Sequence, residues 1–198
     1  MRPSTASLRP TVVVPVRTEP TVKRRLAHVL DPQERRELVR AMFGHVIGVL
    51  SDCGLRVVAL SPRPLAPDVD IETWIERGRG LNAAIDEATL RTGAPVLIVH
   101  ADLPLVARND IEAVLAAPGD VVIARARDGG TNALLMRTRI RSAFGASSAL
   151  AHAARARAAG LRAHVIDRPG LALDVDDEAS LIASGWKPSA GMFRRPSA

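Results

Sequence analysis

Several residue types and patterns are scarce in this chain of 198 residues, and each scarcity excludes a class of protein. Cys53 is the single cysteine, so no disulfide can form within the chain, and we expect a reduced, cytoplasmic setting. Aromatic residues make up 3% and tyrosine is absent, so the core must consist mostly of Val, Leu, Ile and Ala. No apolar run approaches the ~20 residues that cross a bilayer. The run at residues 11–16 is also too short for the core of a signal peptide, so we expect no membrane partner.

Acidic residues are outnumbered, which leaves a formal net charge of +6 and a pI near 11.0. A basic chain of this kind binds polyanions such as nucleic acids, anionic membranes or phosphorylated small molecules. The arginines are scattered and no aromatic residues stand between them, so the pattern does not indicate a surface on which the bases of a nucleic acid would stack. We expect no nucleic-acid partner, and a non-catalytic basic α/β module that binds nucleotides or nucleic acid stays an alternative.

Short apolar runs alternate with amphipathic helical patterns, which predicts an α/β fold with a mostly parallel sheet. The predicted strands are residues 11–16, 55–60, 96–99, 121–124, 133–136 and 163–166, with one more at the start of "LALDVDDEASLI". The predicted helices are residues 32–53, 81–88, 110–116 and 148–159 and one after the "DVDD" acids. In the first helix, Asp31 is the expected N-cap, and the expected buried face comprises Leu38, Met42, Val46 and Val49. Without a repeat or a linker, we expect one domain over residues 1–185 and a tail over 186–198.

Acidic residues follow two of the predicted strands, at the edge where open α/β sheets bind ligands. Asp102 comes shortly after the buried run at 96–99, and the "DVDD" acids begin at Asp174. Carboxylates such as those of Asp102, Asp174 and Asp176 are oxygen ligands that Mg²⁺ accepts together with phosphate oxygens and water. The alternatives are that Asp102 is a turn or cap acid and that Asp176 or Asp177 caps the last helix.

Small and hydroxyl-bearing residues form two further clusters. The backbone N–H groups of "DGGTN" (128–132) could approach an anion, but Gly-Gly is equally typical of a hairpin turn. In "FGASSALAH", Gly145, Ser147 and Ser148 precede or begin a helix, where free N–H groups and hydroxyls bind phosphate or carboxylate; a plain serine N-cap is the alternative. His152 shares a predicted helix face with Ser148, so it either contacts a substrate or is an exposed helix histidine. The other histidines have no metal-ligand spacing.

Basic residues dominate the loop after the first strand. Lys23, Arg24 and Arg25 are consecutive there, and we interpret them as a clamp on a triphosphate, with a solvated basic turn as the alternative.

Six segments together resemble a known family. They are "VVVPVRTEPTVKRRLAHVL", "GRGLNAAIDEA", "VHADLPLV", "DGGTNALLM", "FGASSALAH" and "LALDVDDEASL". Their order and approximate spacing are similar to those of the guanylyltransferases of deazaflavin-coenzyme biosynthesis, which act on 2-phospholactate, phosphoenolpyruvate or 3-phosphoglycerate. The resemblance runs from Val12 to Ile182. Each segment is weak evidence alone, but "GGTNALL", "FG" with a downstream Ser and His, and "LDVD" are fairly specific as a set.

The resemblance implies a three-layer α/β/α, Rossmann-like nucleotidyltransferase fold of the nucleotide-diphospho-sugar transferase type, similar to that of molybdenum-cofactor guanylyltransferase. It implies that Asp102 and Asp176 hold Mg²⁺, with Asp174 as a further candidate. It implies that the phospho-acid is contacted by Thr131, Gly145 and Ser148, to which we add Asn132 and His152 as candidates. The expected nucleotide-binding residues are Arg17, Lys23, Gly80, Leu81 and Asn82. The expected catalytic residues are Asp102, Lys23 and Arg25.

The expected reaction is transfer of GMP from GTP to the phosphate of the small acid, with release of pyrophosphate. Arg17 departs from the family, which usually has lysine there, so the exact phosphate contacts and the preferred acid stay open. We expect GTP and a phospho-acid as ligands, and keep the downstream transferase of the pathway and a second copy of the chain open as protein partners. A molybdopterin nucleotidyltransferase is a further alternative, but its Gly-rich loop is missing from "PVRTEPTVKRR".

Overall fold

The computed structural model describes residues 9–17, 23–65 and 70–185, so the tail predicted at 186–198 lies outside the described residues. The strands are β1 (Thr11–Pro15), β2 (Arg56–Ser61), β3 (Glu72–Ile75), β4 (Val96–Val99), β5 (Val121–Arg125), β6 (Thr131–Met136) and β7 (Ala163–Ile166). The helices are η1 (Arg24–Leu26, a 3₁₀ turn), α1 (Pro32–Asp52), α2 (Leu81–Thr92), α3 (Arg108–Ala116), α4 (Ser148–Ala158), α5 (Pro169–Ala172) and α6 (Glu178–Ala183). Among these, no helix has the length and apolarity that crossing a membrane requires.

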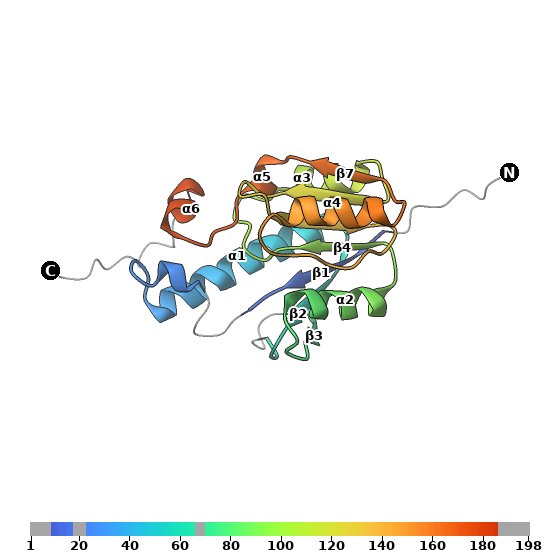
Figure 1. Ribbon diagram of the computed structural model, residues 1–198. Coiled ribbons are helices and arrows are strands. Elements are labelled where there is room, and N and C mark those ends of the chain that lie inside the picture. The colour runs from blue at the N-terminus through green and yellow to red at the C-terminus, as the bar shows by residue number, and fades with distance from the viewer. Residues whose placement is uncertain (1–8, 18–22, 66–69, 186–198) are drawn as a thin grey trace.

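The seven strands form one sheet in the order β3-β2-β1-β4-β6-β5-β7 (Figure 1). All neighbouring pairs are parallel except β4–β6 and β5–β6, so β6 runs against the other strands. The start of β6 therefore lies at the same edge as the carboxyl ends of the other six. The chain leaves β1 for β2 on one side and returns to β4 on the other, and such a switch in strand order opens a crevice for a ligand.

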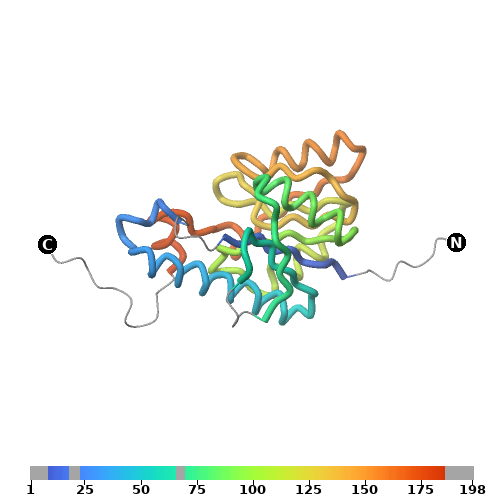
Figure 2. Tube along the Cα trace, turned by 90° about the horizontal axis from the view of Figure 1, so that it is seen from below, coloured from blue at the N-terminus to red at the C-terminus, as the bar shows by residue number. Residues whose placement is uncertain are grey.

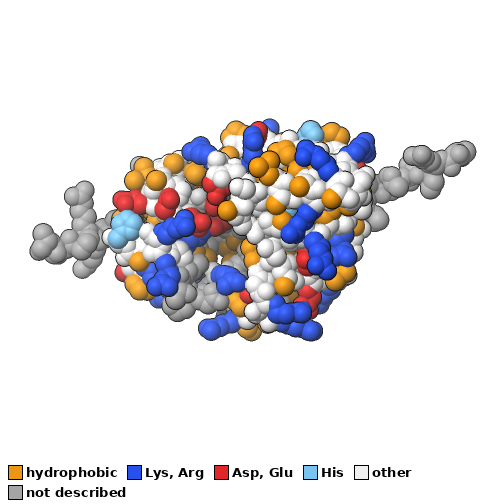
Figure 3. Space-filling view, in the orientation of Figure 1, with side chains coloured by type: hydrophobic (Ala, Val, Ile, Leu, Met, Phe, Trp, Pro, Cys, Tyr) orange, Lys and Arg blue, Asp and Glu red, His pale blue; other side chains and the backbone are white. Residues whose placement is uncertain are grey.

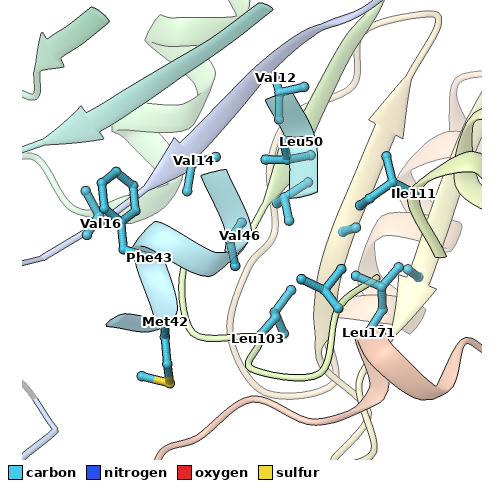
Figure 4. Packing of buried hydrophobic residues seen from close by; sticks show 14 of the residues in the cluster. Val12, Val14, Val16, Met42, Phe43, Val46, Leu50, Leu103, Ile111 and Leu171 are labelled. Carbon is cyan, nitrogen blue, oxygen red and sulfur yellow. The ribbon is translucent and has the colours of Figure 1, made fainter. Parts of the chain in front are cut away.

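Helices cover both faces of the sheet, which confirms the predicted three-layer α/β/α architecture. Along β1 the side chains alternate: Val12 and Val14 belong to one core and Val13 to the other. The first core also contains α1, α3 and α5, and Figure 4 shows Phe43, Val46 and other side chains of α1 packed against β1. The second core contains α2 and α4, which lie together on the opposite side from α1 in Figure 2.

The long helix α1 begins as the sequence predicts. Asp31 caps it by accepting hydrogen bonds from the backbone N–H groups of Gln33 and Glu34 at 2.7 and 2.9 Å, and Pro32 opens the first turn. The predicted buried face is correct for three of its four members, but Val49 is only partly buried, and Leu50 is the fully buried residue at that level.

Two strand predictions were incomplete or wrong. Strand β3 was missed because it is a four-residue edge strand in which only Trp74 is buried, so it has no apolar run. The strand expected at the start of "LALDVDDEASLI" does not form. Pro169 instead opens the short helix α5, and the chain then crosses the strand ends, where the N–H of Val175 donates to the carbonyl of Asp102 at 3.1 Å.

Candidate functional site

A cavity of about 540 Å³ lies at the carboxyl edge of the sheet. Its lining comes from the ends of β1, β2 and β4, the start of β6, the first residues of α2 and α4, and the acidic segment before α6. In the space-filling view, acidic side chains gather beside the hollow between the part that carries η1 and α6 and the rest of the molecule (Figure 3). Side chains distant in sequence meet here because the strand ends bring them to one edge.

Three carboxylates converge on one side of the cavity. One oxygen from each of Asp102, Asp174 and Asp176 lies within 4.8 Å of the others. Asp102 follows β4 and the other two follow α5, and the backbone hydrogen bond from Val175 to Asp102 holds the two segments together. This cluster has the hard oxygen donors and the close spacing that a divalent cation requires.

The ammonium group of Lys23 lies between two of these acids. It forms ion pairs with Asp102 and, at 2.7 Å, with Asp176, while the lysine backbone is left-handed with φ of 51°. Burial alone would lower the pKa of Lys23, but the charges and hydrogen bonds of the two acids outweigh it and raise that pKa above its ordinary value. Burial would likewise raise the pKa of Asp102, but the charges of Lys23 and His100 hold it below its usual range. A positive group thus occupies the position between carboxylates that suits a cation.

The environment of Asp174 disfavours its charged form. Its pKa is raised, first by burial and then by the negative charge of Asp102, although a hydrogen bond from Asn132 opposes the shift. The amide of Asn132 donates to Asp174 at 3.2 Å and to the carbonyl of Leu171 at 3.0 Å. Asn132 is buried at the cavity wall, so its side chain anchors the acidic segment as well as lining the site.

Either Asp176 or Asp177 was expected as a possible cap of the last helix, and Asp177 is the residue that caps it. Its carboxylate accepts from the backbone N–H of Ser180 at 2.8 Å at the start of α6, whereas Asp176 turns to Lys23. Helix α6 lies beside η1 in Figures 1 and 2, and His28 and Glu178 join the two segments at 2.9 Å. Lys23 and Asp176 are therefore carried by neighbouring segments.

The far side of the cavity is formed by the ends of β1 and β2 and the start of α2. Arg17 pairs with Glu76 at 3.5 Å, and Leu81 lines the wall nearby. The amide of Asn82 does not face the cavity lining. It donates to the carbonyl of Phe144 at 3.0 Å and accepts from the N–H of Phe144 at 2.7 Å.

Hydroxyl groups form another part of the cavity wall. Thr131 at the start of β6 and Ser148 at the start of α4 are both buried, and the hydroxyl of Ser148 donates to Oγ1 of Thr131 at 3.1 Å. His152, one turn further along α4, has no exposed surface, so the exposed-histidine alternative is wrong. Its Nδ1 lies 3.0 Å from Oγ1 of Thr131, and its Nε2 accepts from the N–H of Ala143 at 2.9 Å.

Side chains of two helices hold the segment between β6 and α4. Asn82 binds Phe144, and Asp86, one turn later on α2, accepts from the N–H of Ser142 at 2.8 Å. Arg155 of α4 donates to the carbonyl of Ser142. The Phe144 ring lies between two histidine rings, 5.2 Å from His100 and 4.8 Å from His152. The cavity wall at Phe144 is thus fixed from both helices of that face.

The backbone N–H groups of the glycine-rich segment 128–132 form hydrogen bonds within a turn. The N–H of Gly129 donates to Ala126 and that of Gly130 to the Asp128 carboxylate, so "DGGTN" contains the hairpin turn between β5 and β6. The amides at the start of α4 are also engaged, since Ser148 donates to Gly145 and Ala149 to Gly129. Ser147 is the N-cap residue but makes no side-chain cap bond. Hydroxyls, more than these amides, are available to a ligand.

The structure brings most of the predicted site residues together. Those that line the cavity are Arg17, Lys23, Leu81, Asp102, Thr131, Asn132, Gly145, Ser148, Asp174 and Asp176. Four others lie outside its lining: Asn82 and His152 bind the Ala143–Phe144 segment, Gly80 is the exposed N-cap of α2, and Arg25 is exposed in η1. Asn82 and His152 bind the backbone of the segment that forms the cavity wall, whereas Gly80 and Arg25 are exposed to solvent.

The cavity-lining residues that sequence reasoning missed include Glu76, His100 and Phe144. Glu76 comes directly after the unpredicted strand β3, so its place at the strand edge could not be seen. His100 follows the buried run of β4 by one residue, and that position was the signal that could have identified it.

Comparisons with known proteins identify the family of the chain. Residues 10–183 match the family described as "Guanylyl transferase CofC like". The chain is 37% identical over 186 residues to the phosphoenolpyruvate guanylyltransferase of Roseiflexus castenholzii, covering 89% of this chain and 88% of that protein. It is 34% identical over 163 residues to the 2-phospho-L-lactate guanylyltransferase of Methanocella arvoryzae, covering 81% and 74%.

Solved structures confirm the fold. A Desulfovibrio desulfuricans protein named as a nucleotide-diphospho-sugar transferase superposes with a TM-score of 0.68 at 18% identity, covering 84% of this chain and 82% of that one. The 2-C-methyl-D-erythritol 4-phosphate cytidylyltransferase of Thermus thermophilus gives 0.51 at 15% identity, covering 89% and 97%. The family match spans most of the chain and the relatives exceed 30% identity, so the chain belongs to the CofC-like guanylyltransferases.

Proposed function

We propose that the chain transfers GMP from GTP to the phosphate of a small phosphorylated carboxylic acid, with release of pyrophosphate, in biosynthesis of the deazaflavin coenzyme. The observation that carries the proposal is a single cavity lined both by three clustered carboxylates with Lys23 and by the hydroxyls of Thr131 and Ser148. Phosphoenolpyruvate and 2-phospho-L-lactate are the acceptors named for the relatives, and 3-phosphoglycerate is the third candidate.

The chemistry needs few groups from the protein. A phosphate oxygen of the acceptor attacks the α-phosphorus of GTP, a new P–O bond forms, and the bond to the β-phosphate oxygen breaks. The phosphate is already ionised near neutral pH, so no general base is required. Positioning of the two substrates and neutralisation of their charges then account for the catalysis. Lys23 would supply positive charge, and the hydroxyl pair of Thr131 and Ser148 would supply a hydrogen-bond donor for the acceptor.

Asp102, Asp174 and Asp176 fit a magnesium ion, because they offer three hard oxygen donors close together at an exposed edge. When bound, Mg²⁺ supplies Lewis-acid neutralisation of phosphate charge. Lys23 now pairs with two of the same carboxylates, so the ammonium group would be released toward a nucleotide phosphate when a cation takes its place. Arg17 pairs with Glu76 at 3.5 Å and would exchange that partner for a phosphate.

Pyrophosphate release tests the proposal. The protein is incubated with GTP and Mg²⁺ and with each of the three phospho-acids separately, and with GTP alone as the blank. We expect release with one acid and none in the blank, and omission of the divalent cation should abolish it. A folded protein that binds GTP and releases no pyrophosphate with any of the three acids would contradict the proposed reaction.

A further inference from the structure

The part of the cavity wall at Thr131 and Ser148 contains a continuous series of hydrogen bonds. It runs from the N–H of Ala143 to Nε2 of His152 at 2.9 Å, from Nδ1 of His152 to Oγ1 of Thr131 at 3.0 Å, and from Oγ1 of Thr131 to the hydroxyl of Ser148 at 3.1 Å. The side chains of Thr131, Ser148 and His152 are all buried. Thr131 and Ser148 line the cavity, whereas His152 lies behind them.

The backbone fixes which nitrogen of His152 carries the proton. A backbone N–H can only donate, so Nε2 of His152 must be an unprotonated acceptor for Ala143. In a neutral imidazole the other nitrogen then carries the hydrogen, so Nδ1 donates to Oγ1 of Thr131. The oxygen of Thr131 is thereby made an acceptor on the side that faces His152.

Proton counting gives the consequence for the cavity. Thr131 and Ser148 bring two hydroxyl protons, and the single bond between their oxygens uses one of them, whichever residue donates. The second proton has no acceptor at His152, because Nδ1 already points its own hydrogen at Thr131. We propose that His152 is a positioning residue that directs this spare hydroxyl proton of the Thr131–Ser148 pair into the cavity, where it donates to an anionic oxygen of the acceptor.

This inference rests on the proposed function for the identity of the ligand, since the acceptor's phosphate and carboxylate oxygens carry no protons to donate. It also gives a role to a histidine that is buried directly behind the two hydroxyls. Protonation at Nε2 would place a second hydrogen against the N–H of Ala143, so the arrangement requires neutral His152. The groups that face it are Arg155 on its own helix, His100 after β4 and Asp86 on α2, and burial lowers the pKa of His152 to about 4.

Three single substitutions separate the positioning role from mere packing. His152→Leu removes both the donor and the acceptor. His152→Gln keeps one of each, and its carboxamide can accept from Ala143 while donating to Thr131. His164→Leu, on β7 outside the cavity lining, is the matched control. Loss of one hydrogen bond to a charged ligand group should raise the KM for the acceptor roughly 10- to 100-fold in His152→Leu. The KM for GTP should change by no more than about twofold, because the lost hydrogen bond contacts only the acceptor.

We expect His152→Gln to recover most of the acceptor affinity and His164→Leu to leave it unchanged. Equal effects of the Leu and Gln substitutions at position 152, or an unchanged acceptor KM in folded His152→Leu, would overturn the proposal.

A measurement on the unsubstituted protein keeps the proposal testable if a variant does not fold. Long-range ¹H–¹⁵N correlation spectra distinguish the two neutral tautomers and the cation of each histidine, and the spectrum of His152→Gln, or of any other soluble variant at that position, assigns the signal. We expect neutral His152 with the proton on Nδ1 at pH 7. The Nε2–H tautomer or the cation would overturn the proposal. This readout does not depend on turnover, so failure of the proposed reaction and failure of the tautomer assignment are distinguished.

Discussion

Two parts of the cavity wall differ in charge and in burial. The acidic wall contains Asp102, Asp174, Asp176 and Lys23, whose charges lie close together and whose segments, near the outer edge of the fold, are partly exposed. The hydroxyl wall contains Thr131 and Ser148, which are buried, neutral and tied to His152. We expect the first wall to attract and exchange ions, whereas the second has a fixed hydrogen-bond direction.

From this difference we expect the acidic wall to contribute mainly to catalysis and the hydroxyl wall mainly to specificity. Charges at an exposed edge act at a distance and neutralise any phosphate, so they supply rate more than discrimination. A buried neutral donor of fixed direction costs little to reorganise and rejects a group that cannot accept its proton. We therefore expect substitutions in the acidic wall to lower turnover and substitutions in the hydroxyl wall to change the acceptor KM.

Removing one charge from the acidic wall should have the largest effect. Asp102→Asn keeps the shape of the side chain but removes a carboxylate that pairs with Lys23 and belongs to the triad. We expect kcat to fall by about 10³-fold or more, or ~4 kcal/mol, as for the loss of a strong transition-state contact. Steady-state pyrophosphate release measures this, and circular dichroism checks the fold.

The control for that experiment is Asp167→Asn, the same chemical change at an exposed ion pair with Arg125 on the outer strand pair. Exposed pairs of this kind contribute little, so activity and stability should be unchanged. Turnover in Asp102→Asn equal to that of the control would remove the acidic wall from the mechanism.

Acid should weaken the hydroxyl wall in a definite pH window. The pKa of His152 is lowered from 6.5 to about 4 by burial, so the unfolded chain binds a proton at a higher pH than the folded one. The contribution of neutral His152 to the unfolding free energy is therefore fully present above about pH 6.5. It decreases by up to about 3 kcal/mol as the pH falls toward 4.

Urea unfolding of the protein and of His152→Gln at several pH values isolates this contribution, because glutamine does not titrate. The difference in unfolding free energy between the two should shrink from pH 7 to pH 4. A constant difference across that range would mean that His152 is not held neutral.

The clamp behind the hydroxyl wall should matter less. Asn82→Ala removes both hydrogen bonds to Phe144 and leaves a buried N–H and carbonyl without those partners. We expect a loss of about 1–3 kcal/mol in unfolding free energy. The acceptor KM should rise more than the GTP KM if Asn82 supports the wall, whereas a selective rise in the GTP KM would restore its predicted role in nucleotide binding.

The sequence shows the acidic wall better than the hydroxyl wall, and the reason is physical. Asp102 stands at the end of a buried apolar run, so the strand pattern itself places its carboxylate at the ligand edge. The pairing of Asn82 with Phe144, and of His152 with Ala143, joins segments through backbone groups that any residue carries. No residue pattern reveals such contacts, so these two side chains were expected to contact a ligand but lie outside the cavity lining.

The same reasoning explains what was predictable in the fold. Buried strands β1, β4 and β5 are continuous runs of Val, Ile and Leu and appeared at almost their observed bounds. Strand β3 is held by one neighbour and buries only Trp74, over which Arg91 lies at 3.9 Å, so its stability comes from tertiary contacts that a local pattern lacks. The acids after α5 lie at the predicted edge of the sheet. The strand that was expected to carry them there does not form, and they follow the short helix α5 instead.

Arg25 provides the smallest and sharpest test of where the acidic wall ends. It was expected to be catalytic because it follows Lys23 by two residues in a basic run. Lys23 is the N-cap residue of the 3₁₀ turn η1 and faces Asp102 and Asp176, whereas Arg25 lies within η1 and is exposed outside the cavity lining. Arg25→Ala should therefore change kcat and both KM values by no more than about twofold and the unfolding free energy by no more than ~0.5 kcal/mol. A loss of turnover comparable to that of Asp102→Asn would instead mean that η1 rearranges during the reaction and brings Arg25 to the nucleotide.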